Sequence, residues 1–223
     1  MKFLIDLSPS KVQRKLTMHP DLVCGQLCTP LTNYKNWNQT FAIDNGAYSG
    51  LDRNAFFRCL KKHEPHKENC LFVAVPDIVG NHRRTDDLYY FMTQDERMHP
   101  WNEQWCYVAQ DGIEDSRIDW YAIKRLFIGG TDKFKDSSAA HDVVKCAKAM
   151  GIFVHVGRIN SVKRFRQYDE LGADTCDGSG VCKYDWMLEK ISVELGRKPA
   201  PTLFDGEEER EYPQDYDPRK MPS

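Results

Sequence analysis

A repeated alternation of short apolar runs with amphipathic segments is the feature that most constrains how this chain can fold. The runs between the amphipathic segments have the length and composition of strands, at Lys2–Leu7, Leu22–Leu27, Thr40–Asp44, Leu71–Val75, Trp105–Gln110, Arg125–Gly130, Ile152–Val156 and Asp174–Cys176. The segments between them, such as Ser137–Met150, repeat apolar residues at helical spacing. Strands that alternate with helices indicate a parallel sheet. The pattern therefore predicts an α/β fold, a small irregular (β/α)8 TIM barrel.

The expected boundaries and the alternative architecture follow from the same pattern. We expect the barrel to occupy residues 1–197, and the Pro- and acid-rich residues 198–223 to form an extended tail. An open doubly wound sheet is the alternative, but the glycine-rich phosphate fingerprint that would follow its first strand is missing. We also expect helices at Arg84–Met98 and Ile118–Ile123, and a flexible loop at Gly178–Gly180.

The 31 Lys and Arg residues are balanced by 33 Asp and Glu, so the chain as a whole has no electrostatic attraction to nucleic acid. Any nucleic-acid contact must come from a local basic patch. No apolar run approaches the length of a membrane span and the N-terminus has no signal-peptide pattern, so we expect no membrane association and a cytoplasmic location. The cysteines lack the paired spacing of a zinc site, so we expect reduced thiols and no bound metal.

Polar residues stand where several of the predicted strands end. Asp44 and Asp177 are the leading pair, because two carboxylates at one pocket let one act as a nucleophile while the other moves a proton. The carboxyl ends of barrel strands open onto a single mouth, which would bring the two together. Such a pair can break and remake a glycosidic bond through a covalent sugar intermediate. The structural alternative is that Asp44 caps the turn that follows it and Asp177 shapes a loop.

A second group of residues is suited to binding a flat heterocycle. Asp77 and Gln110 together can accept from and donate to the polar edge of a base. Gly129 and Gly130 would let the backbone approach the same ring, and Tyr48 is placed to stack on it. Each also has a purely structural explanation, as a helix cap, a surface amide or a tight turn, and only their joint recurrence at strand ends favours a site.

These motifs resemble those of the tRNA-guanine transglycosylase superfamily. Asp44–Tyr48, Asp77, Val108–Gly112, Ile128–Gly130 and Gly172–Asp177 occur in the order seen in that family. The resemblance implies an irregular (β/α)8 barrel that needs no cofactor and exchanges guanine in a polynucleotide for a 7-deazaguanine. It further implies that Asp177 is the nucleophile at the sugar C1′ and Asp44 the general acid/base. Tyr48 would stack on the base, and Asp77, Gln110, Gly129 and Gly130 would surround its edge.

One departure from the tRNA enzymes points to a different polymer. Those enzymes carry a zinc site of cysteines and a histidine after the nucleophile, whereas here only Cys182 follows Asp177, and no histidine does. The short, zinc-free form is similar to the phage-type DNA transglycosylases, which install 7-deazaguanines such as preQ0 in viral DNA and so protect it from restriction enzymes. The resemblance thus implies DNA as the partner and, for a viral protein, the host cytoplasm as its location.

The polynucleotide is expected to meet basic residues near the mouth, and other functions stay open. The candidate phosphate contacts are Lys133, Lys135, Arg158, Lys163, Arg164 and Arg166. A solvated basic helix face is the alternative reading of the same residues. The alternative functions are a tRNA-guanine transglycosylase, a nucleoside or glycoside hydrolase that uses the same two aspartates, and a non-catalytic barrel that binds nucleic acid.

Overall fold

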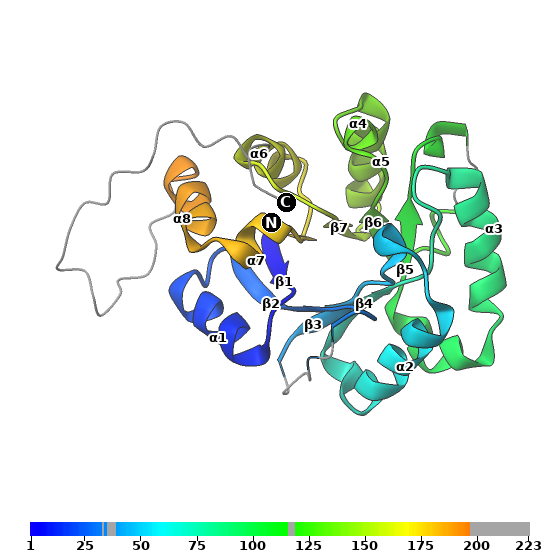
Figure 1. The fold of residues 1–223 in the computed structure, drawn as a ribbon. Helices are drawn as coiled ribbons and strands as arrows, with labels where there is room; N and C mark the ends of the chain where they lie inside the picture. The colour runs from blue at the N-terminus through cyan, green and yellow to red at the C-terminus, as the bar shows by residue number, and fades with distance from the viewer. Residues whose placement is uncertain (33, 35–38, 116–118, 197–223) are drawn as a thin grey trace.

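The computed structural model describes residues 1–32, 34, 39–115 and 119–196. Within them, parallel strands close into a barrel in sequence order, and β1 pairs with β8 to complete the ring (Figure 1). The strands are β1 Lys2–Ile5, β2 Val23–Cys28, β3 Phe41–Ile43, β4 Cys70–Ala74, β5 Trp105–Ala109, β6 Arg125–Ile128, β7 Phe153–Val156 and β8 Thr175–Cys176. The predicted (β/α)8 barrel is confirmed. The predicted tail, residues 198–223, lies outside the described residues.

Helices follow most of the strands and surround the barrel (Figure 1). They are α1 Pro9–Met18, α2 Arg53–His63, α3 His82–Thr93, α4 Asp132–Lys135, α5 Ser138–Ala149, α6 Val162–Glu170, α7 Ser179–Lys183 and α8 Asp185–Glu194, with the 3-10 turns η1 Ala47–Ser49, η2 Glu64–Asn69, η3 Glu96–Gln104 and η4 Ile113–Asp115. Several begin at a side-chain cap, as where Asp52 accepts from the N–H of Ala55. No helix in this part of the chain combines the length and apolar composition that crossing a bilayer requires.

The local predictions around the strands need three corrections. Gly178–Gly180 is not a flexible loop, because α7 begins at Ser179 and Asn160 Oδ1 accepts from the N–H of Gly180 at 3.0 Å. The helix expected to run to Met98 ends at Thr93 and is followed by η3. Residues 119–123 form a turn rather than a helix, since the side chain of Asp119 accepts from the N–H of Tyr121; residue 118 lies outside the described part.

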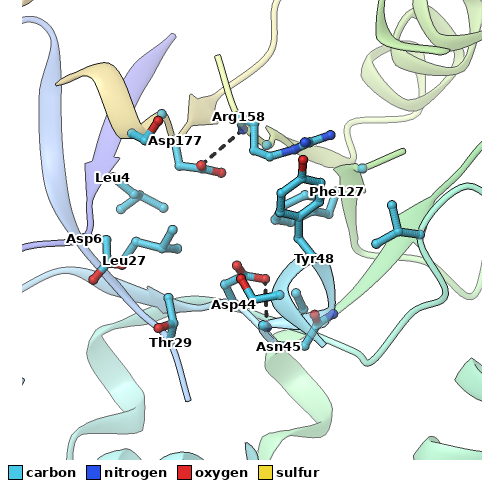
Figure 2. Close-up of a pocket in the computed structure, with 18 of the residues that line it drawn as sticks. Leu4, Asp6, Leu27, Thr29, Asp44, Asn45, Tyr48, Phe127, Arg158 and Asp177 are labelled. Atoms are coloured by element: carbon cyan, nitrogen blue, oxygen red, sulfur yellow. Dashed lines mark hydrogen bonds between the residues drawn. The ribbon is translucent and has the colours of Figure 1, made fainter. Parts of the chain in front are cut away.

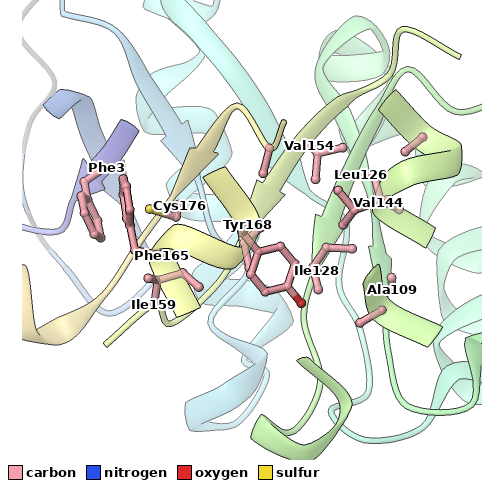
Figure 3. Close-up of a cluster of buried hydrophobic side chains, with 14 of the residues drawn as sticks. Phe3, Ala109, Leu126, Ile128, Val144, Val154, Ile159, Phe165, Tyr168 and Cys176 are labelled. Atoms are coloured by element: carbon pink, nitrogen blue, oxygen red, sulfur yellow. The ribbon is translucent and has the colours of Figure 1, made fainter. Parts of the chain in front are cut away.

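A large apolar cluster fills the space between the strands and the outer helices (Figure 3). The ring of Phe3 on β1 stacks on Phe165 of α6, with centroids 5.2 Å apart. One turn further along α6, the buried hydroxyl of Tyr168 donates to the backbone carbonyl of Lys135 at 2.8 Å. Each buried aromatic side chain contributes about 2–3 kcal/mol of transfer free energy, so these contacts hold α6 against β1 and the end of α4.

The alternation of side chains along each strand decides which residues reach the mouth of the barrel. Residues of the inner cluster include Leu4, Ala42, Val108 and Phe127. Two positions further along, the next inward-facing places are taken by Asp6, Asp44, Gln110 and Gly129. The strands therefore end by turning polar groups toward one opening.

Candidate active site

A cavity of about 640 Å³ opens at the carboxyl-terminal mouth of the barrel. Asp44 follows β3 and Asp177 follows β8, and their carboxylates point into this cavity from opposite sides (Figure 2). The structure therefore brings together the two acids that the sequence singled out. The volume falls within the range of small-molecule pockets, roughly 300–1,000 Å³.

Asp177 is held by one donor on each carboxylate oxygen. The backbone N–H of Arg158 donates to Oδ1 at 3.1 Å, and Nε2 of His155 lies 3.1 Å from Oδ2. Because a carboxylate only accepts, we assign the proton of His155 to Nε2, so that Nδ1 accepts from the hydroxyl of Thr175 at 2.9 Å. Burial lowers the pKa of His155, which favours this neutral form. The orientation of the Asp177 carboxylate is thus fixed from two sides.

Asp44 lies in a contrasting environment. Burial and the nearby charges of Asp177 and Asp77 raise the pKa of Asp44 to about 7. The N–H of Gly46 reaches Oδ1 at 3.5 Å, a weak contact compared with those on Asp177. One acid is therefore fixed by donors, and the other is poised to take up or release a proton near neutral pH. This is the difference that separates a nucleophile from a proton shuttle at a shared site.

A network of amides holds Asp77 on the cavity wall. Nε2 of Gln110 donates to Oδ2 of Asp77 at 2.6 Å, and Nδ2 of Asn45 donates to Oδ1 at 2.7 Å. The N–H of Gly80 in turn donates to Oε1 of Gln110 at 2.9 Å, which fixes the amide orientation. Burial raises the pKa of Asp77 to about 6. The predicted base-reading pair is thus one connected unit, and Asn45 joins it to the turn that carries Asp44.

The glycine pair after β6 lets this unit pack closely. A Cβ on Gly129 would lie 2.5 Å from Nε2 of Gln110, a distance that no side chain tolerates. Gly130 has a φ of +73°, and its carbonyl accepts from the Arg158 guanidinium at 2.6 Å. Gly129 therefore makes room for Gln110, and the Gly130 carbonyl faces a cation.

Tyr48 stands at the rim of the cavity on η1, with 65% of its surface exposed. The guanidinium of Arg158 lies over its ring, 3.9 Å from the centroid (Figure 2). Such a contact is a favourable cation–π interaction. Tyr48, the predicted stacking residue, thus lies beside the cavity with the planar Arg158 guanidinium over its ring.

The expectation of one basic patch built from six side chains needs correction. Lys135 is fully buried and lines the cavity, because α4 turns it inward, so it is not a surface phosphate contact. Arg164 is paired with Asp132 and Asp136, and Arg166 with Glu194. Lys133 and Lys163 are exposed, and Arg158 is half-buried at the mouth. The cations therefore divide into separate environments.

Two residues of the site were not anticipated from the sequence. Asp6 lines the cavity directly after β1, with a buried Oδ1 that has no hydrogen-bond partner among the described residues. Burial and the charge of Asp177 raise the pKa of Asp6 to about 6. Asp6 follows its strand as Asp44 does, so the same rule would have found it had the strand been ended at Ile5. His155 was hidden as a single polar residue inside the apolar run of β7.

The described residues contain no group of three or more His, Cys, Asp or Glu side chains arranged to hold a metal ion. Comparison of the sequence with protein-family models and with curated proteins finds no match.

Proposed function

We propose that this protein exchanges guanine in DNA for a 7-deazaguanine base such as preQ0, through a covalent bond between Asp177 and the deoxyribose C1′. The observation that carries the proposal is the placement of Asp44 and Asp177 on opposite sides of one cavity whose wall bears the Asp77–Gln110 pair. The choice of DNA rests on the sequence resemblance described above.

The two aspartates divide the first half of the reaction. A carboxylate oxygen of Asp177 attacks C1′, and the bond from C1′ to the guanine nitrogen breaks with its electron pair going to the base. Asp44 gives its proton to the departing guanine, which a pKa of about 7 permits at neutral pH. The fixed orientation of Asp177 reduces the entropy cost of reaching the attack geometry.

The second half reverses these steps with a different base. A 7-deazaguanine enters the cavity, and the Asp44 carboxylate accepts the proton from its ring nitrogen. That nitrogen attacks C1′, and the bond from C1′ to Asp177 breaks to restore the carboxylate. One glycosidic bond replaces another, so no external energy source is required.

The wall of the cavity suits the polar edge of guanine. Asp77 can accept from the ring N–H and the exocyclic amine, while the second N–H of the Gln110 amide is available to the base carbonyl. A guanine inside a duplex must leave the base stack to reach this cavity, which costs a few kcal/mol before it stacks on Tyr48.

The direct test is incubation of the protein with DNA, with tRNA, and with labelled guanine or 7-cyano-7-deazaguanine, followed by nucleoside analysis of each polymer. We expect label in the DNA with wild-type protein and none with Asp177→Asn. If label appears in tRNA and not in DNA, the substrate of the exchange is tRNA. No label in either polymer, together with an Asp177→Ala variant that binds nucleic acid like wild type, would support a non-catalytic barrel.

Hydrolysis of the same glycosidic bond is the second candidate, and Asp6 is the observation that favours it. Asp6 lines the cavity close enough to Asp177 for the two charges to interact, and its buried Oδ1 has no hydrogen-bond partner among the described residues. A carboxylate in that position can activate a water that attacks the covalent intermediate. In the same incubation, a hydrolase leaves abasic sites in the DNA and incorporates no label, whereas an exchanger leaves intact modified nucleotides.

A further inference from the structure

Arg158 occupies two of the positions that the proposed function gives to the base. Its guanidinium lies over the Tyr48 ring, 3.9 Å from the centroid, and donates to the Gly130 carbonyl at 2.6 Å. Tyr48 and Gly130 both line the cavity, and Figure 2 shows Arg158 beside the Tyr48 ring. The N1–H and exocyclic amine of guanine form a planar fragment of N–H donors on one carbon, as the guanidinium does. The side chain therefore makes the kinds of contact expected of the substrate base.

We propose that Arg158 is a displaceable occupant of the base site, which leaves Tyr48 when a base enters and then binds a phosphate of the polynucleotide at the cavity mouth. This inference rests on the proposed function and adds to it a residue that gives up its contact with Tyr48 and binds the polynucleotide instead. Base entry and strand binding are thereby coupled through one side chain.

The surroundings of Arg158 allow its side chain to leave without disturbing the nucleophile. The contact with Asp177 comes from the backbone N–H of Arg158, not from the guanidinium. The Gly130 carbonyl keeps a second cation nearby, since Nζ of Lys135 lies 3.5 Å away. The charge of Arg158 helps to lower the pKa of Lys135 to about 8, behind the larger effect of burial, so the two cations oppose each other. Departure of the guanidinium relieves that repulsion.

The backbone at Arg158 is also unusual. Its φ of +57° makes it the only non-glycine residue with a positive φ in the described part of the chain. Such a conformation is unfavourable for a side chain with a Cβ and is retained where surrounding contacts enforce it. Here it allows one residue to direct its N–H to Asp177 and its side chain to Tyr48.

A phosphate is the anion best suited to the released side chain. Arg164 and Arg166 are already paired with carboxylates, whereas the guanidinium of Arg158 contacts a carbonyl and an aromatic ring. Its planar donors match two phosphate oxygens at once. The mouth of the cavity is where the strand that carries an extruded nucleotide must pass.

The test compares Arg158→Gly, which keeps the left-handed backbone accessible, with Arg158→Lys and with Lys163→Ala as a control that removes one exposed cation. Circular dichroism first establishes that each variant is folded. Calorimetry measures the Kd for free 7-cyano-7-deazaguanine, and fluorescence anisotropy measures the affinity for a guanine-containing oligonucleotide over a series of salt concentrations.

For Arg158→Gly we expect base affinity to rise about threefold to tenfold, because the competing side chain is gone. Oligonucleotide affinity should fall, and its logarithmic salt dependence should lose about one unit of slope. Arg158→Lys should keep the salt slope and bind the base more tightly than wild type, and Lys163→Ala should leave base affinity unchanged. Weaker base binding by Arg158→Gly, or an unchanged salt slope, would overturn the inference. Failure of the wild-type protein to bind the base would instead count against the proposed function.

Discussion

The environments of Asp44 and Asp177 differ although both face the same cavity. Asp177 receives a donor on each oxygen, from His155 and from the backbone of Arg158. The N–H of Gly46 makes a long contact with Asp44, and burial together with the charges of Asp177 and Asp77 raises the pKa of Asp44. In the proposed reaction, these contacts favour Asp177 as the nucleophile and Asp44 as the proton carrier.

At the residue scale we predict how guanine release depends on pH. Asp44 must be protonated to assist the departing base, and burial raises its pKa to about 7, so kcat/KM should fall as pH rises through about 7. Asp44→Asn should lower the rate by about 10²- to 10⁴-fold and remove this alkaline limb. Single-turnover release of labelled guanine between pH 5.5 and 9 would measure both.

Asp6→Asn is the matched control for this prediction. The charges that raise the pKa of Asp44 are those of Asp177 and Asp77, so the limb should stay near pH 7 when Asp6 is neutralised. If Asp6→Asn shifts the alkaline limb of the pH profile and Asp44→Asn does not, the proton donor is Asp6 and not Asp44.

At the scale of elements, the close approach of β5 and β6 positions the Gln110 amide, which we propose reads the base. Gly129 follows β6, and its N–H donates to the Ala109 carbonyl of β5 at 3.0 Å. This pairing places the glycine against Gln110, where there is no room for a Cβ. The geometry of the Asp77–Gln110 unit therefore depends on a residue that has no side chain.

We predict that Gly129→Ala displaces Gln110 from Asp77 and weakens base binding by at least tenfold, because the new Cβ would lie 2.5 Å from Nε2 of Gln110. Gly151→Ala is the control: its φ is +72° and a Cβ there meets no atom within 4 Å. That change should cost about 1–2 kcal/mol of stability through backbone strain and leave base affinity intact. Equal losses of base affinity in the two variants would show that the effect is one of general destabilisation.

The strands were predictable from the sequence because each is a short apolar run between clear helical patterns, and the tips at Asp44, Asp77, Gln110 and Asp177 followed from them. The ion pairs between different helices could not be predicted from the sequence. Arg164 on α6 meets Asp132 and Asp136, contacts that depend on how α6 packs beside α4. Lys135 was expected to contact phosphate because it follows Gly130, but its side chain is buried at the end of α4, next to the buried Phe134.

At the scale of the whole molecule, the cavity holds several aspartates in positions where their burial lowers the stability of the fold. Asp6, Asp44 and Asp77 all have a pKa raised well above the usual value of an aspartate, chiefly by burial. An acid whose pKa is higher in the folded than in the unfolded state makes the protein less stable as pH rises between the two values. The fold thus keeps unfavourable carboxylates together at the barrel mouth, as expected of a functional site.

We predict that Asp44→Asn becomes stabilising relative to wild type as pH rises from about 4 to about 7. Over that range the folded wild-type protein holds a proton on Asp44 that the unfolded chain has lost, because the pKa is raised from 3.8 to about 7. The difference in unfolding free energy should grow by at most about 1.4 kcal/mol per pH unit. Urea unfolding of both proteins at pH 4.5, 6 and 8 measures it, and the comparison cancels the opposite contribution of histidines such as His63. A difference that stays constant with pH would contradict the placement of Asp44 in this environment.

The covalent bond between Asp177 and the sugar is the central claim, and trapping it is the most direct test. Wild-type protein is mixed with a guanine-containing DNA oligonucleotide without an incoming base, denatured rapidly, digested and analysed by mass spectrometry. We predict an oligonucleotide adduct on the peptide that contains Asp177, released guanine in equal amount, and neither with Asp177→Asn. An adduct on another residue such as Asp6, or release of guanine with abasic DNA and no adduct at any time, would contradict the account.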